Sequence, residues 1–305
     1  MPELPDVVVY IESLDRYLTG KKLTDLIIIN PFVLRSVDPP LGRVTGRRVT
    51  GFERLGKRIV FCLEDDFFLV VHLMIAGRFT WSTEQKLPSR KIGLAAFVFE
   101  HGRVFFTEAG TKRRASLHAV QGRGNLNGFD RGGLEIEGST CETFGRVLQR
   151  ENHTLKRALT DPRLFSGIGN SYSDEILHRA GLSPFKQTRG MKQEEIDSLH
   201  SAVVTVLEEW TKRLRDETGD GFPKKVTAFR KEMAVHGKHG EPCPVCSTPV
   251  QRIRYAENEC NYCPVCQTGG KLLADRALSR LLKSDWPSTV DELESMKGGP
   301  GLTGS

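Results

Sequence analysis

The sequence predicts an α+β fold with three parts: a β-rich N-terminal domain led by one helix, a helical middle domain and a small four-cysteine finger. Three observations support this. Short runs of Val, Ile and Phe, punctuated by Gly, Pro and Asp-Asp, dominate residues 1–135. Helical spacing of apolar residues takes over after residue 140. Two Cys-x-x-Cys pairs then follow between residues 243 and 266.

The N-terminal domain is expected to open with a helix over residues 5–18. Apolar residues recur there at helical spacing from Leu4 to Leu18, and Gly20 follows as a stop signal. After Gly20 the pattern changes to short β-branched and aromatic runs, which are typical of a β-sandwich or barrel. The expected strands are residues 23–30, 47–55, 57–63, 67–73, 92–100 and 103–108.

The middle of the chain is predicted to be helical. Residues 122–138 are rich in Gly, Asn and Asp and indicate a linker. Residues 165–170 form a tight turn with two glycines, in which Asn170 is the expected N-cap of the next helix and backbone N–H groups suit a phosphate. An ordinary connection between helices is the alternative. The expected helices are residues 141–150, 155–161, 171–180 and 192–217.

The composition describes a globular protein of about two domains, with 38% hydrophobic and 27% charged residues among 305. No apolar run approaches the roughly 20 residues that span a bilayer, and no secretory signal opens the chain, so we expect a cytoplasmic protein. Lys and Arg exceed Asp and Glu by 44 to 38. Residues 224–254 alone hold seven basic and two acidic side chains, which favours a polyanionic partner over a merely solvated basic surface.

The cysteine spacing predicts a zinc site. Two Cys-Pro-Val-Cys knuckles are separated by 16 residues, the pattern of a tetrahedral four-thiolate zinc ribbon with Zn–S distances of about 2.3 Å. Residues 247–262 are expected to form the intervening hairpin, and Cys260 to be a bystander or a substitute ligand. Such a ribbon can bind nucleic acid or protein, or only support the fold. The expected ligands are Cys243, Cys246, Cys263 and Cys266, while Cys62 and Cys141 are expected to be structural.

The first residues of the chain could supply a nucleophile. Removal of Met1 before a small residue would leave Pro2 with a free secondary amine, which can attack an aldehyde carbon and form an iminium ion. An α-amine titrates near about 7.7–8.0, so desolvation or nearby cations leave much of it neutral at pH 7. Glu3 could move protons beside it. The alternative is a solvated leader ahead of a helix.

With these parts in order, the chain resembles the formamidopyrimidine-DNA glycosylase / endonuclease VIII family of bifunctional DNA repair enzymes from Met1 to about Gln267. Five features carry the resemblance: the start Met-Pro-Glu-Leu-Pro-Asp, the position of Lys57, His72-Leu73 before a small loop, residues 167–175 (GIGNSYSDE), and residues 240–243 (GEPC) leading into the cysteine hairpin.

The resemblance implies an N-terminal β-sandwich over residues 1–135, a helix–two-turn–helix domain over 136–225 and a zinc finger over 226–268. Residues 269–305 are an extension, for which a packed helix around Leu272–Trp286 and a disordered end at 298–305 are expected. The implied function is base excision repair by a monomeric bacterial-type protein, a DNA glycosylase and AP lyase acting on oxidised bases and abasic sites in double-stranded DNA. A flipped nucleotide would be attacked in a pocket.

The resemblance also implies roles for single residues. Pro2 would attack C1′, Glu3 would protonate the sugar ring oxygen or shuttle protons, and Lys57 would hold a phosphate. Further DNA-binding candidates are His72, Met74, Arg113, Lys156 near the damaged site, Gly169 and Asn170 on a phosphate, and Arg252, Arg254 and Asn258 on the hairpin.

Two departures from the family pattern bear on substrate and activity. Family members carry an Arg five residues before the third zinc ligand, where this chain has Asn258, so Arg252 or Arg254 would have to compensate. The void-filling residue is Met74 or Ile75, residues 108–114 offer no aromatic wedge, and the span 220–229 is too short for a loop that closes over an oxidised purine. Two other functions stay open: a catalytically weak binder of damaged or branched DNA, and a structural zinc-ribbon protein.

Overall fold

The structure, a computed structural model, describes residues 1–305 except 111, 225, 256–257, 274–286, 291, 293–294 and 296–305. The chain forms two compact units, of which the first contains residues 1–135, 165–167 and 207–228 and the second residues 136–164, 168–206 and 229–305. Most of the helix expected over 272–286 and the end expected at 298–305 lie outside the described residues. No helix within the described part is long and apolar enough to cross a membrane.

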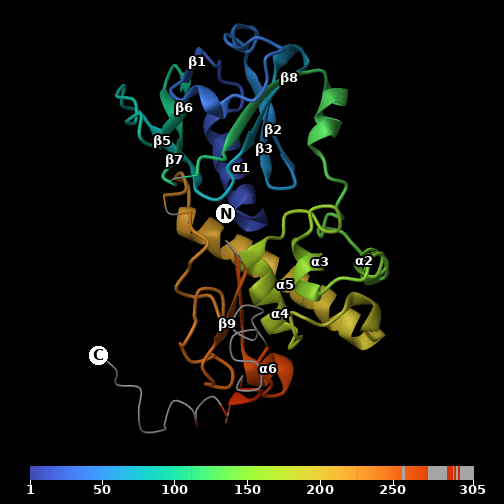
Figure 1. Ribbon diagram of the computed structural model, residues 1–305. Coiled ribbons are helices and arrows are strands. Elements are labelled where there is room, and N and C mark those ends of the chain that lie inside the picture. The colour runs from blue at the N-terminus through green and yellow to red at the C-terminus, as the bar shows by residue number, and fades with distance from the viewer. Residues whose placement is uncertain are drawn as a thin grey trace, which may run out of the picture. The chain divides into compact units, whose positions relative to one another are not determined.

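The first unit is a sandwich of two four-stranded antiparallel sheets (Figure 1). Aromatic rings from both sheets meet in its core, where the Phe61 and Phe97 rings stack at 4.8 Å between centroids. In the order of pairing, one sheet contains β1 (Asp25–Ile28), β6 (Gly93–Phe99), β7 (Gly102–Glu108) and β5 (Gly77–Ser82). The other contains β2 (Val49–Leu55), β3 (Arg58–Leu63), β4 (Phe67–His72) and β8 (Ser116–Gln121).

Helix α1 (Leu4–Leu18) anchors the start of the chain on this sandwich. Its apolar residues Val7, Tyr10 and Leu14 recur at helical spacing and are buried almost completely, because that face packs against β2 and β3 (Figure 1). The Tyr10 hydroxyl lies 3.3 Å from the backbone oxygen and nitrogen of Phe79 on β5. Burial of one helical face therefore fixes the position of the first residues.

Two strands of the sandwich were not predicted. β5 follows the small loop expected after Leu73, and only Gly77 and Phe79 of its six residues are buried, so its alternation is incomplete. β8 follows the basic run 112–114 and has a short apolar pattern carried by Leu117 and Ala119. Both become strands because a neighbouring strand supplies their hydrogen bonds, β7 for β5 and β4 for β8.

The four helices expected between residues 141 and 217 are all present. They are α2 (Cys141–Leu148), α3 (Leu155–Thr160), α4 (Asn170–Arg179) and α5 (Gln193–Thr218), of which α5 contributes to both units. Two details differ from expectation. The predicted linker contains the 3₁₀ segment η4 (Arg123–Phe129), and Gly169 rather than Asn170 is the N-cap of α4, so Asn170 is already the first helical residue. Glycine tolerates the extended backbone at the cap without requiring a side-chain acceptor.

A two-stranded hairpin and a short helix form the expected ribbon: β9 (Gln251–Tyr255), β10 (Asn258–Tyr262) and α6 (Pro264–Thr268). The extension begins as part of it. The Leu272 N–H donates to Ser288 O at 2.8 Å, the Val290 N–H donates to Gly270 O at 3.3 Å, and the Leu273 N–H donates to the Tyr262 hydroxyl at 2.8 Å. Residues 287–290 are thus bound to the edge of the ribbon.

Phe79 is the centre of the aromatic core, because its ring lies within 6.0 Å of those of Tyr10, Phe61, Phe97 and Phe106. We expect Phe79→Ala to reduce the free energy of unfolding by about 3–5 kcal/mol, the cost of a large core cavity. The neighbouring exposed residue gives a matched control, since Thr80→Ala should stay within about 0.5 kcal/mol of the unmodified protein. Urea unfolding followed by circular dichroism tests both, and equal losses would contradict this packing.

Candidate functional site

The amino terminus is held by a reciprocal cap. Pro2 is buried and Glu3 is 1% exposed. The Glu3 N–H donates to Asp6 Oδ2 at 3.0 Å, while the Glu3 carboxylate accepts from the Asp6 N–H at the start of α1. This box satisfies two backbone donors and places a carboxylate next to Pro2.

The turn between α3 and α4 supports the same end of the chain. The Leu4 N–H donates to Gly167 O at 2.9 Å. Gly167 has φ of 80°, and a Cβ built on it would lie 2.7 Å from the Leu4 Cβ. Only glycine combines this backbone conformation with so close an approach. The first glycine of the predicted phosphate turn is therefore needed for placing the terminus.

Lys57 lies at the tip of the β2–β3 hairpin, where Gly56 adopts φ of 61° in the two-residue turn. Its side chain is half-buried. Desolvation lowers the pKa of the ammonium, and the charge of Glu3 opposes this shift. The charges of Glu3 and Lys57, two residues of the predicted site, therefore act on each other beside the terminus.

The terminal amine, carried by Met1, has a pKa below its ordinary value of 8.0. Burial is the largest cause, because desolvation penalises the charged form. Glu3 and Asp6 raise the pKa, whereas the cations Arg78 and Lys57 lower it, Arg78 more than Lys57. These surroundings shift the amine toward its neutral, nucleophilic form.

His72 ends β4, opposite Arg58. Burial lowers its pKa to about 4, with contributions from the charges of Arg58, Lys57 and His118. The imidazole is therefore neutral at pH 7 and can offer a hydrogen bond to DNA but no charge.

The loop after His72 is a tight turn closed by the Gly77 N–H, which donates to Leu73 O at 2.8 Å. Met74 occupies the left-handed region with φ of 52° and is half-buried, whereas Ile75 is 54% exposed. Of the two void-filling candidates, Ile75 presents the larger apolar surface. Arg113, another predicted DNA contact, is exposed before β8, and its guanidinium donates to Lys91 O.

In the second unit, Lys156 points at the start of α4. Its ammonium donates to Asn170 O at 2.6 Å, Ser173 Oγ at 2.9 Å and Asp174 Oδ1 at 2.5 Å, and its side chain is 11% exposed. Three internal partners satisfy all three donors of this ammonium. Lys156 therefore orders the Gly169-Asn170 turn, and a direct contact with DNA is not what its geometry favours.

Two acidic residues of α4 connect this turn to the ribbon, a function that spacing alone did not reveal. Asp174 Oδ2 lies 2.7 Å from His236 Nδ1 and 3.1 Å from the Asn261 N–H. Glu175 accepts the backbone N–H groups of residues 234–236 at 2.7–2.9 Å. Burial opposes ionisation of Asp174, yet the charges of Lys156 and His236 hold its pKa below the usual range.

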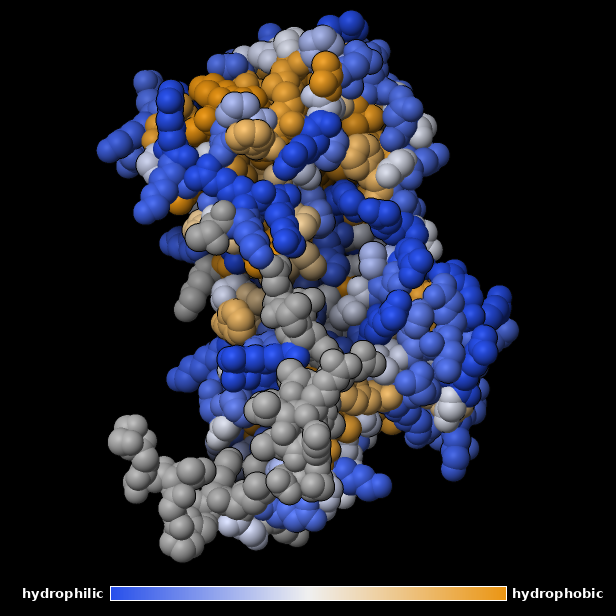
Figure 2. All heavy atoms as spheres, in the orientation of Figure 1, coloured by the Kyte–Doolittle hydropathy of each residue, from blue (hydrophilic) through white to orange (hydrophobic). Residues whose placement is uncertain are grey.

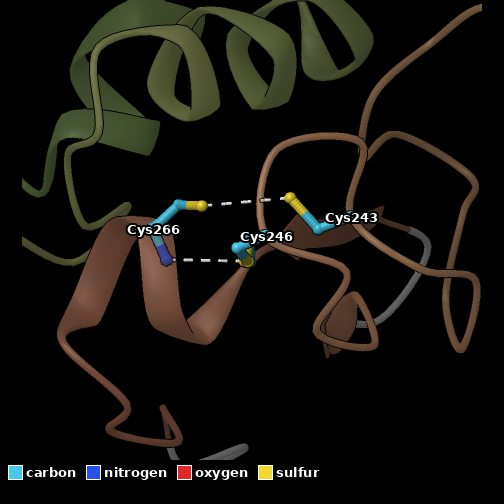
Figure 3. Close-up of side chains that lie close together, drawn as sticks. Cys243, Cys246 and Cys266 are labelled. Atoms are coloured by element: carbon cyan, nitrogen blue, oxygen red, sulfur yellow. Dashed lines mark hydrogen bonds between the residues drawn. The ribbon is translucent and has the colours of Figure 1, made fainter.

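The four predicted ligand thiols form one cluster. All four sulfur atoms lie within 4.8 Å of one another, with Sγ–Sγ distances of 3.9 Å for Cys243–Cys266 and 3.3 Å for Cys246–Cys263. Figure 3 shows the sulfur atoms of Cys243 and Cys266 pointing toward each other. A tetrahedron of Zn–S bonds of about 2.3 Å requires sulfur separations of about 3.8 Å. The donor set therefore fits a tetrahedral metal ion.

Hydrogen bonds favour the thiolate form at one member of the cluster, Cys246. Burial opposes ionisation of Cys246, but hydrogen bonds from Thr248 and the neighbouring thiols lower its pKa to about 6. His178 Nε2 on α4 lies 3.2 Å from Cys243 Sγ, an outer-shell donor position. Cys260 is buried and not a member of the cluster, as expected for a bystander.

The ribbon hairpin carries the remaining candidates. Arg252 lies 3.6 Å from Glu259 across the two strands, and Arg254 is exposed. The backbone of Asn258 pairs with Tyr255 at the end of the hairpin. In the face shown in Figure 2, the helical region around α2 and α3 is predominantly hydrophilic.

The comparisons with known proteins agree with this architecture. Residues 1–115 match the profile of the formamidopyrimidine-DNA glycosylase N-terminal domain, and residues 134–218 match that of its H2TH domain. The formamidopyrimidine-DNA glycosylases of Desulfitobacterium hafniense and Thermus thermophilus are 31% and 32% identical, each over 88% of this chain and 100% of its own length. An uncharacterised formamidopyrimidine-DNA glycosylase-like protein of Mycobacterium tuberculosis is 43% identical over 48% of this chain and 91% of its own length.

Solved structures show the same fold. A Lactococcus lactis FPG mutant bound to DNA containing Fapy-dG has a TM-score of 0.78 at 26% identity, covering 88% of this chain and 100% of that one. MutM of Thermus thermophilus has a TM-score of 0.72 at 31% identity, covering 87% and 98%. The fold and the thiol cluster are thus those of a zinc-finger DNA repair glycosylase. The chain belongs to the formamidopyrimidine-DNA glycosylase family.

Gly167→Ala should destabilise the N-terminal unit and displace the terminus, because the new Cβ collides with Leu4 in addition to straining the backbone. Gly138 is the matched control: its φ is 72°, but nothing lies within 4 Å of a Cβ there. We expect Gly138→Ala to cost only the conformational strain, about 1–2 kcal/mol, and Gly167→Ala to cost more. Thermal unfolding of both variants tests the difference, which should disappear if Leu4 makes no close contact.

Proposed function

We propose that the protein is a bifunctional DNA glycosylase and AP lyase that uses the amine of Pro2 as its nucleophile on oxidised bases and abasic sites. One observation carries the proposal: Pro2 is buried next to the Glu3 carboxylate, at the start of a helix fixed by a capping box. The same surroundings lower the pKa of the terminal amine, which Met1 carries in this structure. A neutral amine held in place beside a carboxylate is what attack on a sugar carbon requires. Membership of the family supports the substrate class.

The reaction follows from the chemistry of a secondary amine. The Pro2 nitrogen bonds to C1′ as the N-glycosidic bond breaks, the base leaves with that electron pair and takes up a proton, and opening of the sugar gives a cationic iminium. The iminium acidifies the C–H bonds at C2′. Loss of a proton from C2′ breaks the C3′–O bond and releases the 3′ phosphate. A second elimination then breaks the C5′–O bond and releases the 5′ phosphate. Glu3 is the group placed to deliver a proton to the ring oxygen and to accept one afterwards.

The phosphates of the flipped nucleotide require cations and N–H donors. Lys57 supplies a positive charge beside the terminus. Gly169 and Asn170 supply backbone N–H groups at the start of α4, and Lys156 orders this turn through its hydrogen bond to Asn170 O. On the ribbon, Arg254 is exposed, whereas Arg252 forms an ion pair with Glu259. His72 and Arg113 are candidates for further hydrogen bonds, and Met74 or Ile75 for filling the gap left by the base.

The metal that the cluster fits best is zinc, because four thiolates satisfy its preferred ligands and leave no open position. Such an ion would hold the ribbon in shape and would take no part in the chemistry. His178 would stabilise the charge on Cys243.

A second candidate function is binding of damaged or branched DNA with weak turnover. The feature that favours it is Asn258, a neutral side chain at a position where the resemblance implies a phosphate-binding Arg. A neutral amide contributes about half the strength of a charge-assisted contact.

Borohydride reduction distinguishes the two functions, because it converts the iminium into a stable covalent bond. We expect the protein with a free Pro2 to be trapped on duplex DNA containing an abasic site, a form with a blocked amino terminus not to be trapped, and Pro2→Gly to be trapped more slowly. The reaction needs the neutral amine, so its rate should rise with pH through the pKa of that amine, with a midpoint below the ordinary value of 8.0. Failure to trap the unblocked protein on any lesion rules out the lyase.

Metal analysis tests the ribbon. We expect one zinc ion per chain by mass spectrometry of the elements, and Cys243→Ser should lose the ion and lower the melting temperature, because metal binding contributes directly to the stability of small ribbons. Cys141→Ser is the matched control, since the Cys141 thiol donates to Asp197 at 2.9 Å and is no member of the cluster. Equal zinc content in both variants would contradict the assignment.

A further inference from the structure

Arg78 lies near the proposed nucleophile and forms no ion pair with any described residue. It is the second residue of β5 and half-buried. Its Nε donates to Val226 O at 2.6 Å, and its Nη1 donates to Gly77 O at 2.6 Å and to Ile75 O at 3.3 Å. Three neutral carbonyls therefore fix the orientation of the guanidinium.

These contacts leave part of the fork unused. A guanidinium has five N–H donors, and the carbonyls occupy three. Within the described part of the chain, Nη2 has no hydrogen-bond acceptor and no carboxylate forms an ion pair with Arg78. The nearest acids in sequence to the terminus, Glu3 and Asp6, are engaged with each other in the capping box. Partly buried charges normally have an opposite charge, so the missing partner is expected to come from outside the protein.

The position of Arg78 indicates that its anionic partner is a phosphate of bound DNA. Phe79, the residue after Arg78, has its backbone 3.3 Å from the Tyr10 hydroxyl of α1, the helix that follows the amino terminus. The charges of Arg78, at the start of β5, and of Lys57, at the β2–β3 turn, both act on the terminal amine. A deoxyribose bonded at C1′ to the amine carries a phosphate on each side. The two free N–H groups of Nη2 can each donate a charge-assisted hydrogen bond to a phosphate oxygen.

We propose that Arg78 binds a backbone phosphate flanking the nucleotide that the amino terminus attacks. This inference rests on the proposed function and adds a phosphate-binding residue to it. The three carbonyl contacts orient the fork before DNA arrives, which reduces the ordering cost of binding. Because two of them come from Ile75 and Val226, Arg78 also connects the void-filling loop to the segment after α5.

The test is the salt dependence of binding to a duplex with a tetrahydrofuran abasic analogue, which cannot form the iminium and so separates binding from chemistry. Each phosphate contact contributes about 0.9 to the slope of log affinity against log salt. We expect Arg78→Gln to reduce the slope by about that amount and to weaken binding about tenfold at low salt. Arg78→Lys, which keeps the charge and loses the fork, should retain the slope while binding less tightly than the unmodified protein.

Arg103→Gln is the matched control. Arg103 lies on β7 of the same sheet, is half-buried and also donates to a backbone oxygen, that of Gln85 at 2.5 Å. Its substitution should leave the slope unchanged. An equal reduction in Arg103→Gln, or an unchanged slope in Arg78→Gln with melting temperature lowered, would overturn the proposal and make Arg78 a structural residue.

The outcome is independent of the lyase test. If the unmodified protein is trapped by borohydride and the Arg78→Gln slope is unchanged, the phosphate assignment fails and the proposed function stands. If it is not trapped and the slope still falls for Arg78→Gln, the lyase fails and Arg78 remains a phosphate contact. Absence of measurable binding to the analogue duplex would overturn the phosphate assignment, whatever the result of trapping.

Discussion

The packing of α1 on the β-sandwich is the interaction on which the site depends. A nucleophile at the end of a chain is usually mobile, because a terminus has no residue before it to restrain it. Here Val7, Tyr10 and Leu14 bury one face of the helix, and the Glu3–Asp6 box closes its first turn. Hydrophobic burial thereby supplies the positional order that catalysis by a terminal amine requires.

Electrostatics complete what packing begins. Desolvation and the two cations Arg78 and Lys57 favour the neutral amine, while Glu3 and Asp6 oppose them. The same cations are suited to phosphates. One set of charges can therefore serve two requirements of the proposed reaction, an unprotonated nucleophile in the free protein and an anchored backbone in the complex. Neither effect needs a group beyond those that the fold already brings to the terminus.

Much of this organisation was predictable from local patterns. The leading helix, the four later helices and the thiol cluster follow from 3.6-residue periodicity and Cys-x-x-Cys spacing, which are properties of neighbouring residues. β5 and β8 were not predicted, because their strand character comes from pairing with β7 and β4 rather than from their own alternation. The cap of α4 at Gly169 lies within the one-residue uncertainty of helix ends.

The roles of several side chains could not be predicted for a related reason. Lys156 is predicted to lie near the damaged site, but its place in the sequence does not show that its three acceptors lie 14 to 18 residues further along the chain. Arg78 belongs to no motif, and its importance arises from carbonyls at residues 75, 77 and 226 together with its proximity to the terminus. Sequence identifies which residues have useful chemistry, while long-range contacts decide what that chemistry is directed at.

Helix α4 has a mechanical consequence. Its ten residues form a rod about 15 Å long, which begins at Asn170 and carries His178, the neighbour of Cys243, near its other end. In the middle of the helix, Glu175 accepts hydrogen bonds from residues 234–236 and Asp174 accepts one from Asn261. Because α4 is bound near its start, in its middle and near its end, we expect it to move as a rigid unit. A distortion at the thiol cluster would then displace the Gly169-Asn170 turn. The ribbon therefore supports the position of this turn in addition to carrying its own basic residues.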